Sequence, residues 1–190
     1  MNEQQPSTPE HEPTPDSPRV WIASLADYNA GRLHGDWVDA AVDGDELVAA
    51  AEAILATSQE PGAEEWAIFD FDNFGPYRVG EYEDLHQVAA VARGIAEDGE
   101  AFATYAQLSG ARGEDLETDY VEAFVGYWHS LSAFVDDLLD DLGIRESLAD
   151  SLPDWLAAHV SIDRDGVLRD LMVDLHYEDA SDGGVYIYRL

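Results

Sequence analysis

The sequence contains no cysteine and no lysine, and all nine of its basic residues are arginine. Without cysteine there is no disulfide framework, no thiolate metal site and no cysteine nucleophile. No apolar run approaches the length of a membrane-spanning helix. The N-terminal stretch lacks both the basic start and the apolar core of a signal peptide, so we expect a cytoplasmic protein.

Basic residues are scarce because acidic residues dominate: 41 carboxylates give the 190-residue chain a formal net charge of -32. High charge with few apolar residues is typical of disorder. Here apolar residues make up 46%, with five Trp, nine Tyr and six Phe, which predicts a folded protein. Its strongly negative surface should repel nucleic acid and anionic membranes and attract basic proteins and cations.

Patterns typical of enzymes are absent. The sequence has no P-loop, GxGxxG, GxSxG or HExxH, and its six histidines show no metal-ligand spacing. Asp70 and Asp72 could suit paired-carboxylate catalysis, but nothing singles them out among so many acids. We predict no enzyme, no catalytic residue, no metal site and no cofactor.

One stretch, 161–172, resembles the front half of an EF-hand loop through Asp163 and Asp165. It fails at both ends, because Ser161 and Met172 stand where an aspartate and a bidentate glutamate are needed. An acidic helix N-terminus explains the stretch better.

The first part of the chain predicts a small α+β domain. Residues 1–18 are Pro-rich and acidic, which is typical of a disordered tail. The pattern that follows predicts strands at 19–25, 36–42 and 64–72, a loop at 27–35, and a helix from Asp43 or Asp45 to about Leu55. An antiparallel sheet with one helix over 19–75 accounts for it, with Trp21 and Trp37 as expected core aromatics.

The rest predicts a helical middle domain at 76–117 and a second α+β domain at 118–190. The middle domain has one helical stretch, 82–108, punctuated by Gly99. For the last domain we expect strands at 120–128 and at the C-terminus, and helices at 130–142, 153–159 and from Ser161 to about His176. The fold class is therefore α+β, with three small domains in a row.

The stretch FVDDLLDDLGI, residues 134–144, covers most of the helix expected at 130–142 and combines an apolar stripe with four aspartates on its other side. No basic residue lies between Arg112 and Arg145 to balance them. Asp is a poor helix former, and like charges at i,i+4 destabilise a helix. These aspartates are therefore predicted to be unpaired and to serve a purpose other than stability.

Three explanations of the charge remain open: salt adaptation, binding of a basic partner or cations, and imitation of DNA. Carboxylates spread through the whole chain, and basic residues are missing from 35–77 and 113–144. A net charge of -32 equals that of about 54 Å of duplex at one charge per roughly 1.7 Å. Imitation is thus feasible, but charge counting does not separate the three.

Several motifs carry a family resemblance. VWIASLADYNAGRLHGDWVDA, residues 20–40, resembles the opening of the ArdA antirestriction proteins, with Tyr28, Asn29, Gly31, Gly35 and Trp37 in the family's places. EEWAIFDFDNF (64–74) is similar to its acidic strand, FVDDLLDDLGIRESLADSLPDWL (134–156) to its antirestriction motif, and GGVYIYRL to its terminal strand. The resemblance covers about 19–190; the Pro-rich tail departs from it.

The resemblance implies an antirestriction protein of a mobile genetic element, a DNA mimic that inhibits type I restriction–modification enzymes. It implies three small domains in an elongated, curved homodimer, joined through the C-terminal domain. The partner would be the enzyme's methyltransferase core and specificity subunit, with no nucleic acid and no membrane bound. The alternatives are an acidic binder of another basic DNA-binding protein, a salt-adapted protein of unknown activity, and an acidic hydrolase with a carboxylate of raised pKa.

Two groups of residues would carry this function. The DNA-mimic carboxylates would be Asp36, Asp39, Asp43, Asp45, Glu46, Asp70, Asp72, Glu114, Asp115, Glu117, Asp119, Glu122, Asp136, Asp137, Asp140 and Asp141. The antirestriction motif, buried partly against a second subunit, would be Phe134, Leu138, Leu142, Gly143 and Ile144.

Overall fold

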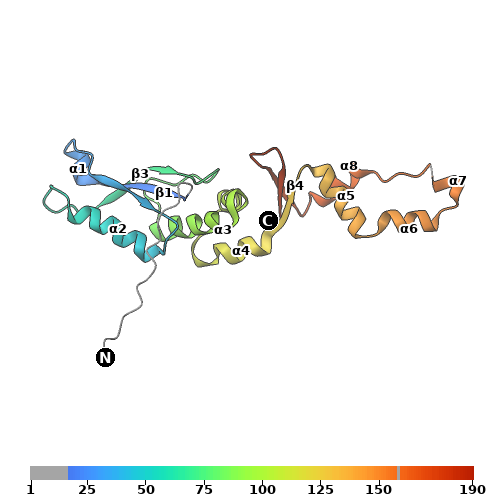
Figure 1. Cartoon of the computed structure of the whole chain (residues 1–190), viewed down its shortest axis with the longest axis horizontal. Helices are drawn as coiled ribbons and strands as arrows, with labels where there is room; N and C mark the ends of the chain where they lie inside the picture. The colour runs from blue at the N-terminus through green and yellow to red at the C-terminus, as the bar shows by residue number, and fades with distance from the viewer. Residues whose placement is uncertain (1–16, 158) are drawn as a thin grey trace, which may run out of the picture. The chain divides into compact units, whose positions relative to one another are not determined.

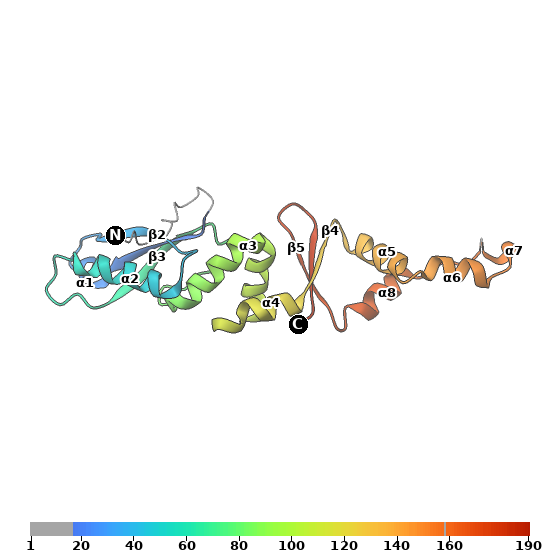
Figure 2. The same ribbon diagram turned by 60° about the horizontal axis from the view of Figure 1, so that its bottom comes forward.

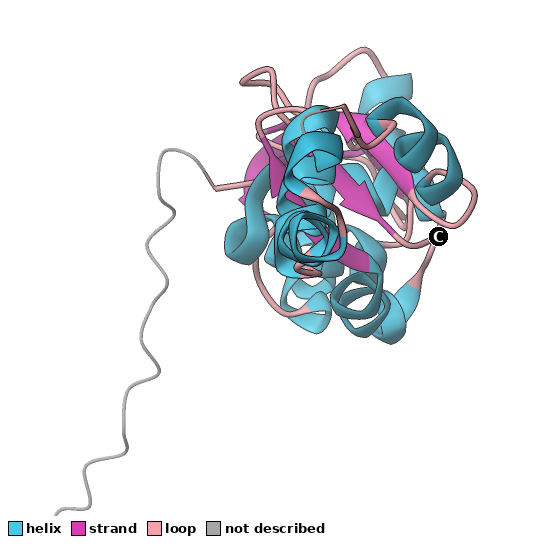
Figure 3. Ribbon diagram, turned by 90° about the vertical axis from the view of Figure 1, so that its right-hand side faces the viewer, coloured by secondary structure: helices cyan, strands magenta, loops and turns pink. Residues whose placement is uncertain are grey.

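The computed structural model describes residues 17–157 and 159–190 (Figure 1). The chain forms two compact units that meet in sequence at Gly99 and Glu100. Helices and strands both contribute to the fold, in cyan and magenta in Figure 3, so the predicted α+β class is confirmed. The boundaries at 75 and 117 stay a prediction.

The N-terminal unit is built on a three-stranded antiparallel sheet of order β2-β1-β3. Its strands are β1 (Arg19–Ser24), β2 (Gly35–Asp39) and β3 (Trp66–Asp72). Helix α1 (Leu25–Asn29) follows β1, and α2 (Gly44–Ala56) lies against β1 and β2, as Figures 1 and 2 both show. Each predicted strand and the main helix are therefore present.

The core of this unit forms between the sheet and its helices. Val20 and Ile22 of β1 are fully buried, as are Leu47 and Ala51 of α2. The long helix α3 (Leu85–Ser109) begins here and buries Val88, Val91 and Ala92. It is interrupted at Gly99, whose φ of 65° and ψ of -143° favour a residue without a side chain.

The C-terminal unit holds the second antiparallel sheet, of order β4-β6-β5. Its strands are β4 (Phe124–Trp128), β5 (His176–Asp179) and β6 (Val185–Tyr188), and it also contains the 3₁₀ helix η1 (Gly113–Asp115) and α4 (Leu116–Ala123). Aromatic rings fill its core: Tyr120 stacks on Phe124 with centroids 5.2 Å apart. Tyr188 is fully buried and donates its hydroxyl to the carbonyl of Ala101 at 2.8 Å.

Four helices complete this unit: α5 (Leu131–Asp141), α6 (Ile144–Ser151), α7 (Asp154–Ala157) and α8 (Arg164–Leu171). Phe134, Val135 and Leu139 of α5 form a buried cluster with Ile187 of β6. Helix α8 packs against α5, and the partly buried Val167, Leu168 and Leu171 of α8 contact the cluster. The apolar stripe of the acidic helix therefore supports the core of this unit, as predicted.

Several predicted elements differ from the structure. The start of the loop predicted at 27–35 is helical, because α1 continues to Asn29 with Ser24 as its N-cap. The strand predicted at 120–128 begins at Phe124; before it lies α4, which places Tyr120 in the aromatic core. In these places tertiary packing overrides local propensity.

The last predicted helix is also wrong in its bounds. Asp163, not Ser161, caps α8 by accepting from the amide of Gly166 at 2.9 Å, and the helix ends at Leu171. Strand β5, which starts at His176, was not predicted: it forms a hairpin with β6 across the turn at 180–184, and the helix expected up to about His176 extended over its start. The acidic helix N-terminus preferred over an EF-hand is thus present.

Most of the predicted disordered tail, residues 1–16, lies outside the described residues. The last two residues of that segment join the sheet. The carbonyl of Ser17 accepts from the side-chain amide of Asn73 at 3.1 Å, and the carbonyl of Pro18 accepts from the backbone of Ala40 at 2.9 Å. Ordered backbone therefore begins before Arg19.

Candidate functional site

Helix α2 presents a group of carboxylates at its N-terminus. Asp43 caps the helix, accepting from the amide of Asp45 at 2.9 Å. Asp45 and Glu46 stand exposed in the first turn, where the helix dipole favours negative charge. His86 lies 3.1 Å from Asp45, and this hydrogen bond raises the pKa of the imidazole. The charge here is fixed on regular backbone.

The first sheet carries four of the predicted carboxylates, in two different states. Asp36 and Asp70 are exposed, and each accepts only from the amide that follows it in the chain, at 2.8 and 2.9 Å. Asp39 and Asp72 are partly buried: Asp39 accepts from the Ser17 hydroxyl at 2.9 Å, and Asp72 pairs with Arg19 at 2.9 Å. Asp36 and Asp70 are therefore the most open of the four, whereas Asp72 is about half exposed and paired with Arg19.

Helix α4 and the turn before it hold the most open acidic group of the C-terminal unit. All the predicted carboxylates with described side chains here are exposed: Asp115, Glu117, Asp119 and Glu122. Within the described part of the chain, no ion pair joins these four to an arginine. The side chain of Glu114 lies outside the described residues.

The aspartates of α5 are not unpaired, so that prediction is wrong. Arg145 contacts both Asp136 and Asp140 at 2.6 Å, and Arg164 contacts Asp136 at 2.9 Å. Asp137 accepts from the indole of Trp128 at 3.1 Å. Asp141 is exposed, so the face carries less free charge than its four aspartates suggest.

The physical reason lies in the chain after α5. Gly143 takes a left-handed conformation with φ of 62°, which ends α5 and starts α6, so Arg145 reaches back to the preceding helix. Arg164 arrives on α8, which packs against α5. The contacts of Asp136 with Arg145 and Arg164 span nine and 28 residues, separations at which a one-dimensional charge pattern gives no pairing. Only the contact of Arg145 with Asp140 is local, at five residues.

The predicted motif residues divide by burial. Phe134 is buried, Leu138 is half-buried, and Leu142 beyond the helix is 62% exposed. Ile144, at the start of α6, is also exposed. Helix α6 buries none of its residues, and Trp155 on α7 is 74% exposed. An apolar surface therefore continues beyond the core cluster of this unit.

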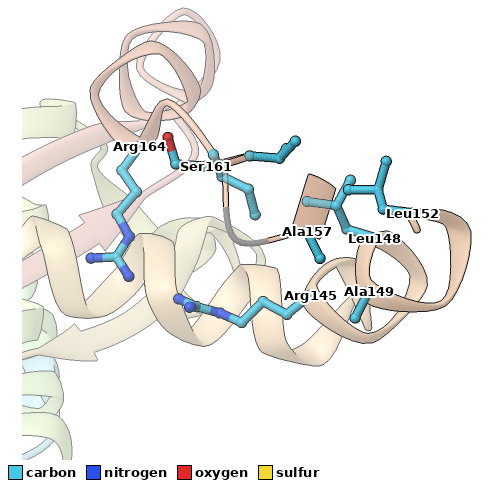
Figure 4. Close-up of a pocket in the computed structure, with 9 residues that line it drawn as sticks. Arg145, Leu148, Ala149, Leu152, Ala157, Ser161 and Arg164 are labelled. Carbon is cyan, nitrogen blue, oxygen red and sulfur yellow. The ribbon is translucent and has the colours of Figure 1, made fainter. Parts of the chain in front are cut away.

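A pocket of about 540 Å³ opens between α6, α7 and the start of α8. Its apolar lining includes Leu148, Leu152 and Ile162, and its other end carries two arginines. Figure 4 shows the side chains of Arg145 and Arg164 extending toward each other at that end. They are the same two that bind Asp136, so the pocket borders the acidic face of α5.

A buried carboxylate, Asp27, was missed by sequence reasoning. It is fully buried and accepts hydrogen bonds from the Ser58 hydroxyl and from Arg32, at 3.0 and 3.2 Å for the two guanidinium nitrogens. The bond from Ser58, with help from Ser24 and Arg32, holds its pKa at about 2. Arg32 also pairs with Glu60. Asp27 thus ties the segment after α1 to the segment after α2.

The residues that carried the family resemblance gain structural roles around this site. Tyr28, next to Asp27, packs on Phe69 of β3 with centroids 4.8 Å apart. Gly35 leaves room for the neighbouring strand, since a Cβ there would lie 2.4 Å from the carbonyl oxygen of Ile22. The signal for Asp27 was available: an arginine stands five residues later, at position 32.

The two tryptophans of this block lie on the sheet and not in the core, contrary to expectation. Trp21 is half-buried and Trp37 is exposed, with ring centroids 5.9 Å apart in an edge-on arrangement. Val20 and Ile22, the neighbours of Trp21 in β1, take the buried positions. Alternation along the strand therefore directs the indoles away from the core.

Neither a metal site nor a membrane-spanning helix is found in the described part of the chain. No group of three or more His, Cys, Asp or Glu side chains among residues 17–157 and 159–190 is arranged to hold a metal ion. Over the same residues, no helix combines the length and the apolar character needed to cross a membrane.

Comparison with known proteins identifies a family. A search of curated proteins finds nothing similar to this chain. A family model described as antirestriction protein (ArdA) matches residues 20–186, which include β2 to β5, the acidic helices and the Asp27 site. The match agrees with the resemblance carried by the opening block and the acidic helix. The chain belongs to the ArdA family of antirestriction proteins.

Proposed function

We propose that this chain is a mimic of B-DNA that occupies the DNA-binding groove of a type I restriction–modification enzyme, on its methyltransferase core and specificity subunit. Family membership supports antirestriction, and the exposed carboxylates on both units carry the proposal of mimicry. The exposed members are Asp36, Asp43, Asp45, Glu46, Asp70, Asp115, Glu117, Asp119, Glu122, Asp137, Asp140 and Asp141.

The spacing of these charges is compatible with a phosphate-binding groove. Glu117, Asp119 and Glu122 lie within six residues of α4. The five steps between the first and the last rise about 7.5 Å, which gives roughly one charge per 2.5 Å. B-DNA carries about one charge per 1.7 Å of axis. Because phosphate contacts carry no sequence information, inhibition should not depend on the enzyme's target site. Occupying the groove should block methylation as well as restriction.

Rigidity is needed because a protein gains less than DNA from the release of condensed counterions. The acidic groups of α2 and α4 stand on regular helices, and the helices are anchored by the buried side chains Leu47, Ala51, Leu116 and Tyr120. Fixed anions lose little side-chain and backbone entropy on binding. The energy lost to unpaired charges in the free protein is thereby offset in the complex.

A displacement titration tests the proposal. A type I methyltransferase is loaded with labelled duplex DNA, the protein is added, and the titration is repeated over a salt series. We expect stoichiometric displacement that weakens as salt rises and is equal for two enzymes with different target sequences. No displacement at low salt, together with stability that increases in molar salt, would overturn mimicry in favour of salt adaptation.

We also propose a homodimer formed through the C-terminal unit. The exposed apolar residues Leu142, Ile144 and Trp155 support it. They lie on, or shortly before, helices α6 and α7, which also contribute residues to the pocket of Figure 4. Apolar patches of this kind are typical of interaction sites. A second copy would cover them and extend the acidic surface across both chains.

Sedimentation of a Leu142→Asp variant tests the dimer. Because Leu142 is largely exposed in the single chain, the variant should fold. A charge placed in an apolar interface should raise the dimer dissociation constant by about 100-fold or more. Val173→Asp is the matched control, because Val173 is 80% exposed and lies outside the pocket. Equal sedimentation of both variants and the unaltered chain would contradict this interface.

A further inference from the structure

One face of the first sheet gathers indoles and carboxylates. Strand pairing sets Trp21 opposite Trp37 on β2 and opposite Asp70 on β3, and it sets Arg19 opposite Asp72. Directly opposed residues of antiparallel strands share a face, so all five side chains lie on one side of the sheet. We call Trp21, Trp37, Asp70 and Asp72 the indole–carboxylate face.

An arginine of the chain itself occupies this face. The guanidinium carbon of Arg19 lies 4.8 Å from the centre of the Trp37 ring. Its Nη2 and Nε donate to one carboxylate oxygen of Asp72, at 2.9 and 3.3 Å. A planar cation stacked on an aromatic ring and hydrogen-bonded to a carboxylate is the arrangement by which proteins recognise arginine.

Arg19 is held weakly. Its side chain is 49% exposed and that of Asp72 is 48% exposed, so water screens the ion pair. Two other members of the face, Trp37 and Asp70, are exposed, and Trp21 is half-buried. Helix α2 packs with Val20 and Ile22, which alternate with the residues of the face along β1. A second guanidinium can therefore reach these groups when Arg19 moves away.

We propose that the indole–carboxylate face is a receptor for an arginine side chain of the basic partner, and that Arg19 fills it in the free chain and is displaced on binding. The inference rests on the proposed function for the partner's basic character. Carboxylates alone attract lysine and arginine alike, whereas an indole beside a carboxylate favours the planar, weakly hydrated guanidinium. The indole–carboxylate face would thus distinguish arginine from lysine, which the other carboxylates of the surface do not.

Peptide titrations of the full chain test the receptor directly. Blocked tetra-arginine and tetra-lysine peptides are added at physiological salt, and the indole ¹⁵N–H resonances of the tryptophans are followed by NMR, assigned by single Trp→Phe variants. We expect the arginine peptide to bind about three-fold more tightly, with the largest shifts at Trp37 and Trp21. Equal binding of both peptides without a shift at Trp37 would overturn the inference.

Two matched variants isolate Arg19. Arg19→Ala and Arg169→Ala change the net charge identically, and Arg169 is exposed on α8, with its nearest acidic partner at 3.9 Å. Removing Arg19 empties the face, so affinity for the arginine peptide should rise by about three-fold in that variant alone. Equal affinities of the two variants would overturn the inference.

Two variants of Trp37 test the indole. Trp37→Leu should abolish the preference for the arginine peptide, and Trp37→Phe should retain part of it. Circular dichroism checks that each variant folds.

The same variants in the DNA-displacement titration separate this inference from the proposed function. Displacement by the unaltered chain, with Arg19→Ala and Arg169→Ala equal in both titrations, would overturn the receptor and leave mimicry standing. Absence of displacement by every variant, with arginine-selective shifts at Trp37, would overturn mimicry and support the receptor for another arginine-bearing protein.

Discussion

Helices α4 and α5 are neighbours in the sequence with similar composition but different electrostatics. Each buries an apolar side, and each has four described carboxylates on its surface or in the turn before it. On α5, two arginines contact Asp136 and one of them also contacts Asp140. On α4, no described arginine forms an ion pair with the carboxylates. Acidic density along a sequence therefore does not measure free charge.

The contrast separates two uses of a carboxylate. A carboxylate paired within the chain stabilises the fold and offers a partner little, whereas an unpaired one destabilises the fold slightly and remains available. The buried Asp27 is the extreme of the first use, and α4 is the extreme of the second. Substitution of Asp27 should therefore affect mainly stability, and substitution of the carboxylates of α4 should affect mainly binding.

The largest effect on stability should come from Asp27→Asn. Asp27 is fully buried, and the change removes the carboxylate charge to which Arg32 and Ser58 donate their hydrogen bonds. We expect the melting temperature to fall by about 5–10 °C, measured by circular dichroism. Asp36→Asn removes the same charge from an exposed site and should leave the melting temperature nearly unchanged. An equal loss in the two variants would show that the Asp27 cluster is not a structural anchor.

The same site predicts a dependence on pH. The pKa of Asp27 is about 2, below the ordinary value of 3.8, so the folded state favours its ionised form. The stability that it contributes is complete above about pH 4 and is lost as the pH falls toward 2. Protonation of exposed carboxylates relieves self-repulsion and acts in the opposite direction. The difference between the unaltered chain and Asp27→Asn should therefore shrink below pH 4 in urea unfolding curves.

The largest effect on inhibition should come from neutralising the open helices. We expect the combined variant Glu46→Gln, Glu117→Gln, Asp119→Asn and Glu122→Gln to raise the Kd for the restriction enzyme by about 10- to 100-fold, since each lost contact is worth a few tenths of a kcal/mol or more. Its stability should be unchanged or higher. Displacement titrations and thermal melts give the two values.

The matched set is the four aspartates of α5 changed to asparagine. Both sets alter the net charge equally, so both should slow association to a similar extent. The first set removes four carboxylates without an arginine partner in the described part of the chain, whereas Asp136 and Asp140 of the second set are already paired with arginines, so the first set should speed dissociation more. Stopped-flow measurements distinguish the two rates. Equal dissociation rates for the two sets would refute the contrast between α4 and α5.

Much of the fold follows from local patterns. The alternation in β1 to β3, the cap at Asp43 and the stripe of Phe134, Val135 and Leu139 all lie where the sequence predicts them. Two elements were missed for different reasons. The helical form of 116–123 depends on packing against Phe102, 18 residues before Tyr120. Strand β5 forms a local hairpin with β6 across the turn at 180–184, and the predicted helix extended over its start. The acidic positions were easy to find, whereas which of them stay open depends on where Arg145 and Arg164 arrive.

A smaller effect, with opposite signs for stability and inhibition, should follow from Arg145→Gln. Two partly exposed ion pairs are lost, so the free energy of unfolding should fall by about 1 kcal/mol in urea titrations. Asp136 keeps Arg164, while Asp140 becomes open. Inhibition should then strengthen by roughly two-fold. A variant that is less stable and also a weaker inhibitor would show that Arg145 itself supports the binding surface.

The smallest effect should follow from Asp141→Asn. Asp141 is exposed at the end of α5, where a negative charge is unfavourable to the helix dipole. Neutralising it should therefore leave stability unchanged or higher by a few tenths of a kcal/mol and weaken inhibition by less than about two-fold. Because charge in a mimic is distributed, one anion among many should matter little. A loss of ten-fold or more would instead identify α5 as a direct contact, and the surface near Asp141 would then bind despite the arginines beside it.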